Sequence, residues 1–254
     1  MSVLKLEGIT QEFGGLRALD GVSLEVEKQQ VFGIIGPNGA GKTTLFNIIT
    51  GIYKPTEGNL LFKEQIINGT PAYNIARMGV ARTFQNIRLF NKLSVLDNVK
   101  VGTHGVTDSG LFSNLLGLPK AKREETQITK DALELLDLVG LLEKKWEYAD
   151  NLAYGDQRKL EIARALALNP TLLLLDEPAA GMNSTEKADL IDLINKLRQE
   201  MDLTILLVEH DMNLVMNICE RIAVLDYGKK IAEGNPGDIR SNDRVIMSYL
   251  GVEA

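Results

Sequence analysis

The chain has 254 residues, with 28 lysines and arginines against 34 aspartates and glutamates, so its formal net charge is −6. Hydrophobic residues make up 44% and charged residues 24%, which is typical of globular proteins and excludes disordered, collagen-like and low-complexity chains. The acidic balance also argues against nucleic acid as a partner, because proteins that bind it mainly through phosphates usually present a basic face.

The single cysteine and the apolar runs indicate the compartment in which the chain works. Cys219 has no second cysteine to pair with, so we expect a buried thiol and a reducing compartment. The first ten residues lack a basic region followed by a long apolar stretch, so we expect no secretory signal. Aliphatic runs such as 172–175 are far shorter than the roughly 20 residues that span a bilayer. We expect a protein that does not cross a membrane by itself, and docking on a membrane protein stays open.

Short strands are expected first, over residues 3–9 and 22–26, with turn signals at Gly14-Gly15 and Asp20-Gly21. The apolar run 31–35 is suited to a strand buried on both faces. A glycine-rich stretch and a helical pattern over 42–50 follow it. These segments predict a strand, a loop and a helix in succession.

The middle of the chain, from about 71 to 168, has mostly helical patterns. Residues 120–139 are amphipathic, and we interpret residues 103–119 as an insertion or long loop. After residue 170, buried-type strands alternate with helical patterns, which predicts a parallel sheet. The expected elements are a strand over 171–175, a helix over 184–200, a strand over 203–208 and a helix over 212–220. The helical middle is predicted to be inserted into one α/β domain.

The strongest functional pattern is the glycine-rich loop after the strand 31–35. It matches the phosphate-binding pattern G-x-x-x-x-G-K-[ST], in which glycines such as Gly39 and Gly41 let backbone N–H groups point inward. The helix N-terminus adds partial positive charge. Lys42 can contact the β- and γ-phosphates, and Thr43 can bind Mg²⁺. The residues expected to bind ATP here are Gly36, Pro37, Asn38, Gly39, Ala40, Gly41, Lys42, Thr43 and Thr44.

Two carboxylates follow the apolar run 172–175. Ligands of parallel sheets bind at the carboxyl ends of the strands, so Asp176 and Glu177 are placed where a nucleotide would lie. Asp176 can hold hydrated Mg²⁺, and Glu177 can orient or deprotonate the attacking water. Because adjacent strand residues face opposite ways, the turn after the strand must redirect Glu177. The alternative interpretation is a solvated strand end.

Ordered motifs over nearly the whole chain resemble those of the nucleotide-binding subunits of ATP-binding cassette (ABC) transporters. They are Gln85 in Arg82-Thr83-Phe84-Gln85, the signature-like Leu152-Ala153-Tyr154-Gly155-Asp156-Gln157, Ala180-Gly181-Met182-Asn183 at the D-loop, His210 in Val208-Glu209-His210-Asp211, and Phe13. The resemblance implies an α/β fold. It comprises a P-loop NTPase (RecA-like) core, an N-terminal antiparallel β subdomain and a helical subdomain inserted near 86–168, all within one ATP-binding domain over 1–254.

The resemblance also implies a role for each matching residue. Gln85 would sense the metal and the γ-phosphate, His210 would touch the γ-phosphate, and Phe13 would stack on adenine. Gly155, at a helix start expected near Asp156, would bind the phosphate of a second subunit's ATP. The catalytic set is then Glu177, His210 and Gln85, and the metal set is Thr43, Gln85 and Asp176, with ATP and Mg²⁺ as cofactors.

The departures from the usual motifs point to a subgroup. The signature normally reads Leu-Ser-Gly-Gly-Gln, whereas Ala153 and Tyr154 replace its serine and first glycine. Ala153 cannot offer a hydroxyl, so we expect a weaker phosphate contact through Gly155 and the helix N-terminus. Asn183 replaces the usual D-loop aspartate. These features, with the motifs near Phe13 and Gln85, resemble the ATPases of branched-chain amino acid importers and their relatives for urea or short amides.

The resemblance implies two ATPs sandwiched between two head-to-tail ATPase subunits, identical or different. The partners would be polytopic permease subunits and, indirectly, an extracytoplasmic binding protein, with the chain at the cytoplasmic face of the membrane. The apolar residues Phe84, Ile87, Leu89 and Phe90 are candidates for docking a permease helix, or else ordinary core. The expected function is ATP hydrolysis that powers branched-chain amino acid uptake. The alternatives are another ABC transporter, a soluble ABC ATPase and a P-loop kinase.

Overall fold

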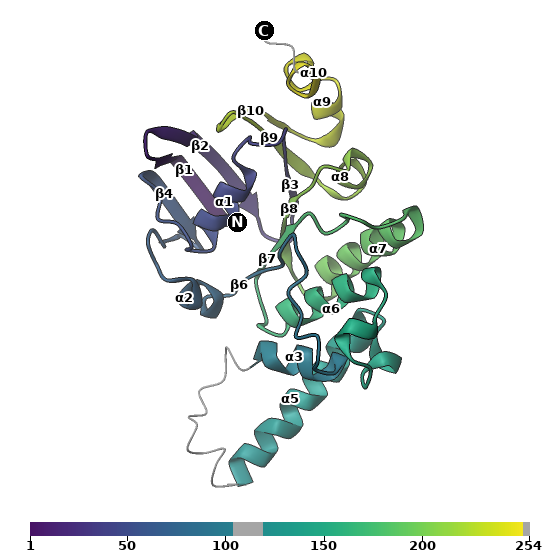
Figure 1. Cartoon of the computed structure of the whole chain (residues 1–254). Helices are drawn as coiled ribbons and strands as arrows, with labels where there is room; N and C mark the ends of the chain where they lie inside the picture. Colours follow the sequence, from purple (N-terminus) through teal and green to yellow (C-terminus); the bar gives the residue numbers. More distant parts are fainter. Residues whose placement is uncertain (104–118, 251–254) are drawn as a thin grey trace. The chain divides into compact units, whose positions relative to one another are not determined.

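The computed structural model describes residues 1–103 and 119–250 (Figure 1). The chain forms two compact units: a core unit of Met1–Arg82 and Thr171–Ala254, and a helical unit of Thr83–Pro170. Apart from its two end residues, the insertion expected over 103–119 lies outside the described residues. That the whole chain forms one domain stays a prediction.

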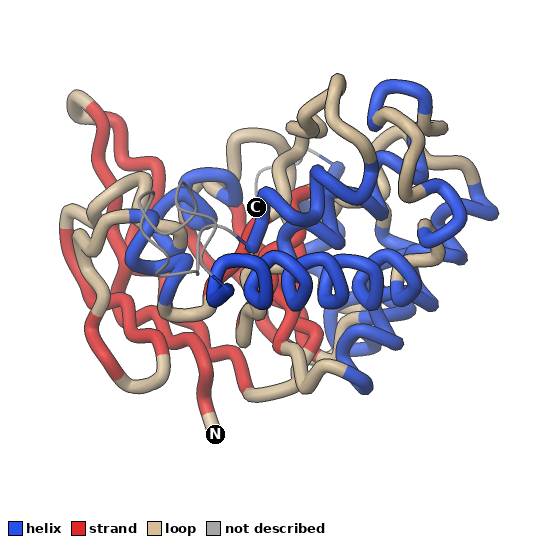
Figure 2. The backbone as a smooth tube through the Cα atoms, turned by 90° about the horizontal axis from the view of Figure 1, so that it is seen from below, coloured by secondary structure: helices blue, strands red, loops and turns tan. Residues whose placement is uncertain are grey.

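The core unit contains a four-stranded antiparallel sheet in the order β2-β1-β4-β5 (red in Figure 2). Its strands are β1 (Ser2–Phe13), β2 (Leu16–Glu27), β4 (Glu57–Phe62) and β5 (Gln65–Ile66). The turn expected at Asp20-Gly21 is wrong, because both residues lie inside β2. Ile9 pairs with Val22 and Gln11 with Leu19, so the register shifts between these two pairings. Asp20 and Gly21 therefore lie opposite a single residue of β1, as in a β-bulge.

The second sheet of the core unit has six strands in the order β10-β9-β3-β8-β7-β6. All neighbours are parallel except β10 and β9, which confirms the parallel sheet predicted from the alternating pattern. The strands are β3 (Val31–Ile35), β6 (Val80–Arg82), β7 (Leu172–Asp176), β8 (Thr204–Val208), β9 (Arg221–Asp226) and β10 (Lys229–Gly234). The carboxyl ends of β3, β8, β7 and β6 therefore meet at one edge of the sheet.

Helix α1 (Lys42–Ile49) joins the two sheets into one hydrophobic core. Its buried Leu45, Phe46 and Ile49 belong to a cluster that includes Leu6 of β1 and Leu206 of β8. The other helices of this unit are α2 (Ala72–Arg77), α7 (Ser184–Glu200), α8 (Met212–Ile218), α9 (Pro236–Arg240) and α10 (Asp243–Leu250). Because α1 is packed in this cluster, the position of its N-terminus, directly after the glycine-rich loop, is fixed.

The helical unit is built from α3 (Val95–Thr103), α5 (Pro119–Leu138), α6 (Tyr154–Leu166) and two short 3-10 turns at Leu142–Lys144 and Ala149–Asn151. Helix α6 begins at Tyr154, two residues before the start expected at Asp156. Over the described parts of the chain, no helix is both long and apolar enough to span a bilayer.

Candidate active site

The glycine-rich loop after β3 forms a tight backbone cradle. Gly39 and Gly41 have φ angles of 83° and 102°, as the motif requires. The ammonium of Lys42 is turned back into the loop, where it donates to the carbonyl oxygens of Gly36 at 2.7 Å and Pro37 at 2.9 Å. Burial lowers the pKa of Lys42, and the carboxylates of Glu177 and Asp176 counteract part of that shift. The cradle therefore holds a cation whose charge is incompletely solvated.

The first turn of α1 is left without a side-chain cap. Its N-cap residue, Gly41, has no side chain to accept the N–H groups of that turn. By contrast, Asn183 and Asp211 cap α7 and α8 through their side chains. Uncapped N–H groups and a positive helix end favour an anion, so this loop and helix suit phosphate groups.

Asp176, at the end of β7, is paired with a cation that the sequence analysis gave no role. Nη2 of Arg82, at the end of β6, lies 2.7 Å from Oδ2 of Asp176, and the two side chains are 8% and 7% exposed. Nη1 of Arg82 also donates to Oδ1 of Asn47 in α1 at 2.8 Å. Arg82 thus fixes the carboxylate of Asp176 and links the ends of β6 and β7 to α1.

Glu177 turns away from the line of its strand. Its φ angle is 48°, in the left-handed region, which confirms that the turn redirects this side chain. Its Oε1 lies 2.9 Å from Nε2 of His210, which follows β8. The structure therefore brings together two of the three residues expected to be catalytic.

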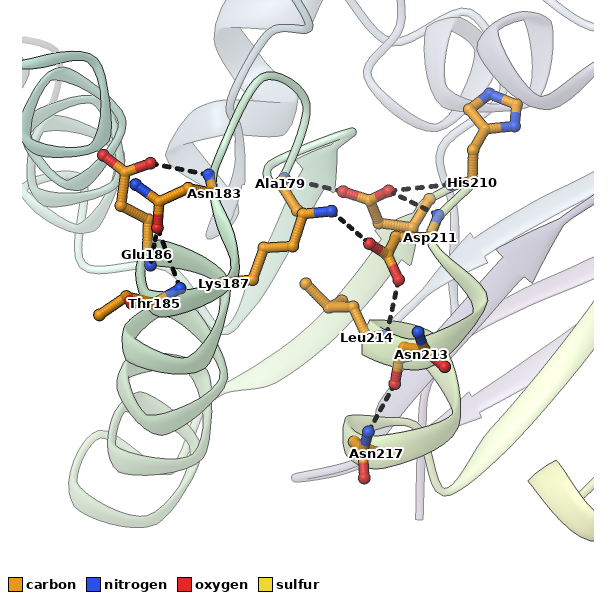
Figure 3. Close-up of polar contacts among 11 residues, drawn as sticks. Ala179, Asn183, Thr185, Glu186, Lys187, His210, Asp211, Asn213, Leu214 and Asn217 are labelled. Carbon is orange, nitrogen blue, oxygen red and sulfur yellow. Dashed lines mark hydrogen bonds and ion pairs between the residues drawn. The ribbon is translucent and has the colours of Figure 1, made fainter.

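The segment between Glu177 and α7 is fixed at both ends. The backbone N–H of Ala179 donates to Oε1 of Glu209 at 2.7 Å. Asn183, expected in the D-loop, is the N-cap of α7 and forms a capping box with Glu186 (Figure 3). The spacing of these two residues in the sequence was a signal for this cap. Glu209, in contrast, stands next to His210 in a motif that gives it no role of its own.

Phe13 lies at the end of β1 and is 41% exposed. Its ring packs edge-on against Tyr53, with the centroids 5.2 Å apart, so an aromatic pair stands where a single stacking ring was expected. An exposed aromatic edge can stack on a base. That Phe13 stacks on adenine stays a prediction.

Gln85 and Gly155 both belong to the helical unit, where a buried charge pair ties their segments together. Arg158 of α6 donates to the carbonyl oxygens of Phe84, at 2.7 Å, and of Gln85, and lies 3.2 Å from Glu161. Gly155 lies in the uncapped first turn of the same helix. The structure thus holds the backbone of Gln85 against the signature helix. The roles of Gln85 and Gly155 at a nucleotide stay predictions.

The residues of the core unit suit a magnesium–nucleotide complex. Thr43 and Asp176 offer hard oxygen ligands of the type that Mg²⁺ prefers. Over residues 1–103 and 119–250, no group of three His, Cys, Asp or Glu side chains could hold a metal ion by itself. In sites that bind nucleotides, Mg²⁺ usually takes one or two protein ligands together with phosphate oxygens and water.

Known proteins with similar sequences show the family to which this chain belongs. The family model described as "ABC transporter" matches residues 19–180, which include the glycine-rich loop, Gln85, Asp176 at the end of β7 and Glu177 after it. The chain belongs to the ABC transporter family. A second model, "Branched-chain amino acid ATP-binding cassette transporter", matches residues 229–254. The protein is therefore an ATPase of the ABC type with a P-loop NTPase fold.

Relatives within the ABC transporter family match over nearly the full length. The high-affinity branched-chain amino acid transport ATP-binding protein LivG of Escherichia coli (strain K12) is 49% identical over 98% of both chains. The corresponding BraF protein of Pseudomonas aeruginosa is 47% identical over 98% of both chains.

Solved structures show the same ABC fold. A nucleotide-free ATP-binding cassette from an ABC transporter has a TM-score of 0.86 and 33% identity, covering 98% of this chain and 99% of that one. A dimeric cassette in a post-hydrolysis state, bound to ADP and Pi, has a TM-score of 0.76 and 28% identity, covering 92% of this chain and 98% of the other.

Proposed function

We propose that this chain is the ATP-hydrolysing subunit of an importer for branched-chain amino acids, docked on permease subunits at the cytoplasmic face of the membrane. The names of the LivG and BraF relatives support the substrate class. The branched-chain family model at the C-terminal end supports it independently of the general ABC motifs. An extracytoplasmic binding protein would deliver the amino acid to the permease.

The observation that carries the catalytic assignment is the contact between Glu177 and His210, 2.9 Å apart at the carboxyl edge of the parallel sheet. Lys42 and the N–H groups of α1 would bind the β- and γ-phosphates. Glu177 would orient or deprotonate the attacking water, and His210 would contact the γ-phosphate. Thr43, Asp176 and Gln85 would hold Mg²⁺, which neutralises phosphate charge when bound.

Two subunits are needed to complete each proposed site. The uncapped N-terminus of α6, with Gly155, would bind the γ-phosphate held by Lys42 of the other subunit. ATP would then close the pair and hydrolysis would reopen it. A lone subunit is expected to bind ATP and hydrolyse it poorly, because half of the phosphate contacts are missing.

Glu177→Gln tests the hydrolytic assignment. We expect normal ATP binding, loss of turnover and an ATP-dependent dimer in size-exclusion chromatography, because the amide keeps the shape and removes the base. If the native pair is a heterodimer, the partner ATPase subunit is included in the measurement. Full hydrolysis by this variant would remove Glu177 from its assigned role.

Lys42→Ala tests the phosphate cradle. We expect nucleotide binding to be lost in an equilibrium titration, because the variant removes the ammonium group that lies against the carbonyl oxygens of Gly36 and Pro37 in the loop. Unchanged affinity for ATP would contradict this assignment of the loop.

The substrate class and partners need a separate test. Purification of the chain from native membranes is expected to recover a polytopic permease and a second ATPase subunit. Cells lacking the chain are expected to lose uptake of labelled leucine and to keep uptake of labelled urea. The reverse pattern would assign the chain to the urea and short-amide transporters instead.

A further inference from the structure

Glu209 is a buried acidic residue to which the motifs give no role. It follows β8 directly, next to His210, and is 3% exposed. Its Oε1 accepts the backbone N–H of Ala179 at 2.7 Å, and its Oε2 accepts the backbone N–H groups of His210 at 2.8 Å and Asp211 at 3.2 Å. One carboxylate thus joins the loop after β7 to the loop after β8.

This link encloses the residue expected to activate water. The N–H of Glu177 donates to the carbonyl oxygen of Val208 at 2.8 Å, and two residues later the N–H of Ala179 is bound by Glu209. The backbone of Glu177 is therefore held to the end of β8 on both sides. Its left-handed φ of 48° is disfavoured for a residue other than glycine, so it persists only where the surroundings hold it.

We propose that Glu209 is a positioning residue for ATP hydrolysis. Its carboxylate locks the two loops in the register that brings Glu177 within 2.9 Å of His210. The inference rests on the proposed catalytic roles of those two residues. Hydrogen bonds to an ionised acceptor are stronger than neutral ones, which suits a link that must hold a strained backbone.

The chemistry of the link selects the variants. Glutamine has nearly the same shape, but its amide offers one acceptor oxygen, and its nitrogen would face a backbone N–H on the other side. Glu209→Gln therefore breaks one half of the link with the least change in packing. Glu209→Asp keeps both acceptor oxygens on a shorter side chain and serves as the conservative variant.

The control is Thr204→Val, at the opposite end of the same strand. Thr204 is fully buried and its hydroxyl accepts the backbone N–H of Gln29 at 3.0 Å. This variant also removes a buried acceptor for a backbone N–H, so it has a comparable cost in stability, but it lies far along β8 from the reacting groups.

Steady-state hydrolysis of Mg-ATP by the full chain, in the homodimer or heterodimer that is active, is the first measurement. For Glu209→Gln we expect kcat to fall about tenfold to a hundredfold with KM within about twofold. The reason is that misplaced reacting groups slow the chemical step, whereas the contacts that bind ATP are unchanged. Glu209→Asp is expected to lie between this variant and the wild type. Thr204→Val is expected to keep its kcat. Equal losses in Glu209→Gln and Thr204→Val, or an unchanged kcat in Glu209→Gln, would overturn the proposal.

Hydrogen–deuterium exchange without nucleotide gives a readout that does not depend on turnover. In Glu209→Gln we expect faster exchange of the amide that faces the new amide nitrogen, that of Ala179 or that of His210. In Thr204→Val we expect both amides to exchange at the wild-type rate. Unchanged exchange in Glu209→Gln would show that the link does not hold the loops.

Hydrolysis by Glu177→Gln distinguishes an error in the role of Glu209 from an error in the catalytic role of Glu177. If Glu177→Gln is inactive while Glu209→Gln is normal, only the role of Glu209 is wrong, whereas an active Glu177→Gln removes the catalytic assignment itself.

Discussion

Two glycines of the phosphate loop are required for different physical reasons. Gly36 has a φ of 148°, and a Cβ atom there would lie 2.0 Å from the carbonyl oxygen of Leu225 in β9. Gly39 has a φ of 83°, but a Cβ atom there would meet no atom within 4 Å. Gly36 is therefore needed for the close approach of a neighbouring strand, and Gly39 only for its backbone angle.

This difference predicts unequal effects of two alanine substitutions. Gly36→Ala must push β9 away from β3, so we expect a loss of about 3 kcal/mol in the free energy of unfolding, as for overpacked cores. Gly39→Ala should cost about 1 kcal/mol, the usual penalty of a left-handed conformation. Urea denaturation without nucleotide measures both. Equal losses would mean that β9 adjusts to the added methyl group.

The thiol of Cys219 is predicted to be unreactive toward alkylating reagents in the folded protein. The side chain is 5% exposed, and burial raises the pKa of its thiol to about 12. Because the thiolate is the reactive form, iodoacetamide at pH 8 should label it only after unfolding. Labelling followed by mass spectrometry against urea concentration should therefore trace the unfolding curve. Fast labelling without urea would contradict the buried position.

The same shift in pKa predicts how stability depends on pH. The folded state holds the thiol proton up to about pH 12, whereas the unfolded thiol loses it near its usual value of 9.0. The contribution of Cys219 to stability is thus complete below pH 9.0 and declines as the pH rises from there toward 12. Comparison of the wild type with Cys219→Ala from pH 8 to pH 10 isolates this slope. Parallel curves for the two proteins would show that the thiol does not contribute.

Among the elements, helix α7 has a complete capping box. Oδ1 of Asn183 accepts the N–H groups of Thr185 and Glu186, and Glu186 accepts the N–H of Asn183 at 2.9 Å. Asn183→Ala should lower the free energy of unfolding by about 1 kcal/mol, because the first turn loses its acceptor. Asn183→Asp keeps the acceptor and adds a charge that favours the helix N-terminus, so it should be at least as stable as the wild type. A loss in both variants would show that the amide nitrogen, and not the cap, is needed.

Local patterns predicted the elements wherever one signal was unopposed. The strand 31–35 and the helix 184–200 have in the structure the bounds that were predicted from the compact apolar run and from the alternation of strand and helix patterns. The turn predicted at Asp20-Gly21 was wrong because a glycine with positive φ occurs in β-bulges as well as in turns. Which of the two forms depends on how β2 pairs with β1. The cap formed by Asn183 and Glu186 could have been predicted, since its two residues stand three positions apart.

At the scale of the whole molecule, the motifs pointed to the residues that are proposed to react but not to the residues that hold them in place. Lys42, Glu177 and His210 sit in local patterns with a direct chemical meaning. Arg82 and Asp176 are 94 positions apart, and Glu209 and Ala179 are 30 apart. No spacing rule joins such pairs, because the order of strands in the sheet, and not the order in the chain, brings them together.

The division into two units predicts which elements bound nucleotide stabilises. The cradle residues, including Lys42, and the proposed catalytic pair Glu177 and His210 all lie in the core unit. A ligand that binds only the folded state at a hundredfold excess over its Kd stabilises that state by about 2.7 kcal/mol. Hydrogen–deuterium exchange of the isolated chain should therefore slow with Mg-ATP in β3, β8 and β9 more than in α3 and α5. Lys42→Ala should abolish the slowing in the core unit. Equal slowing in both units of the wild type would show that the chain opens as one cooperative body, because local opening then follows the global free energy.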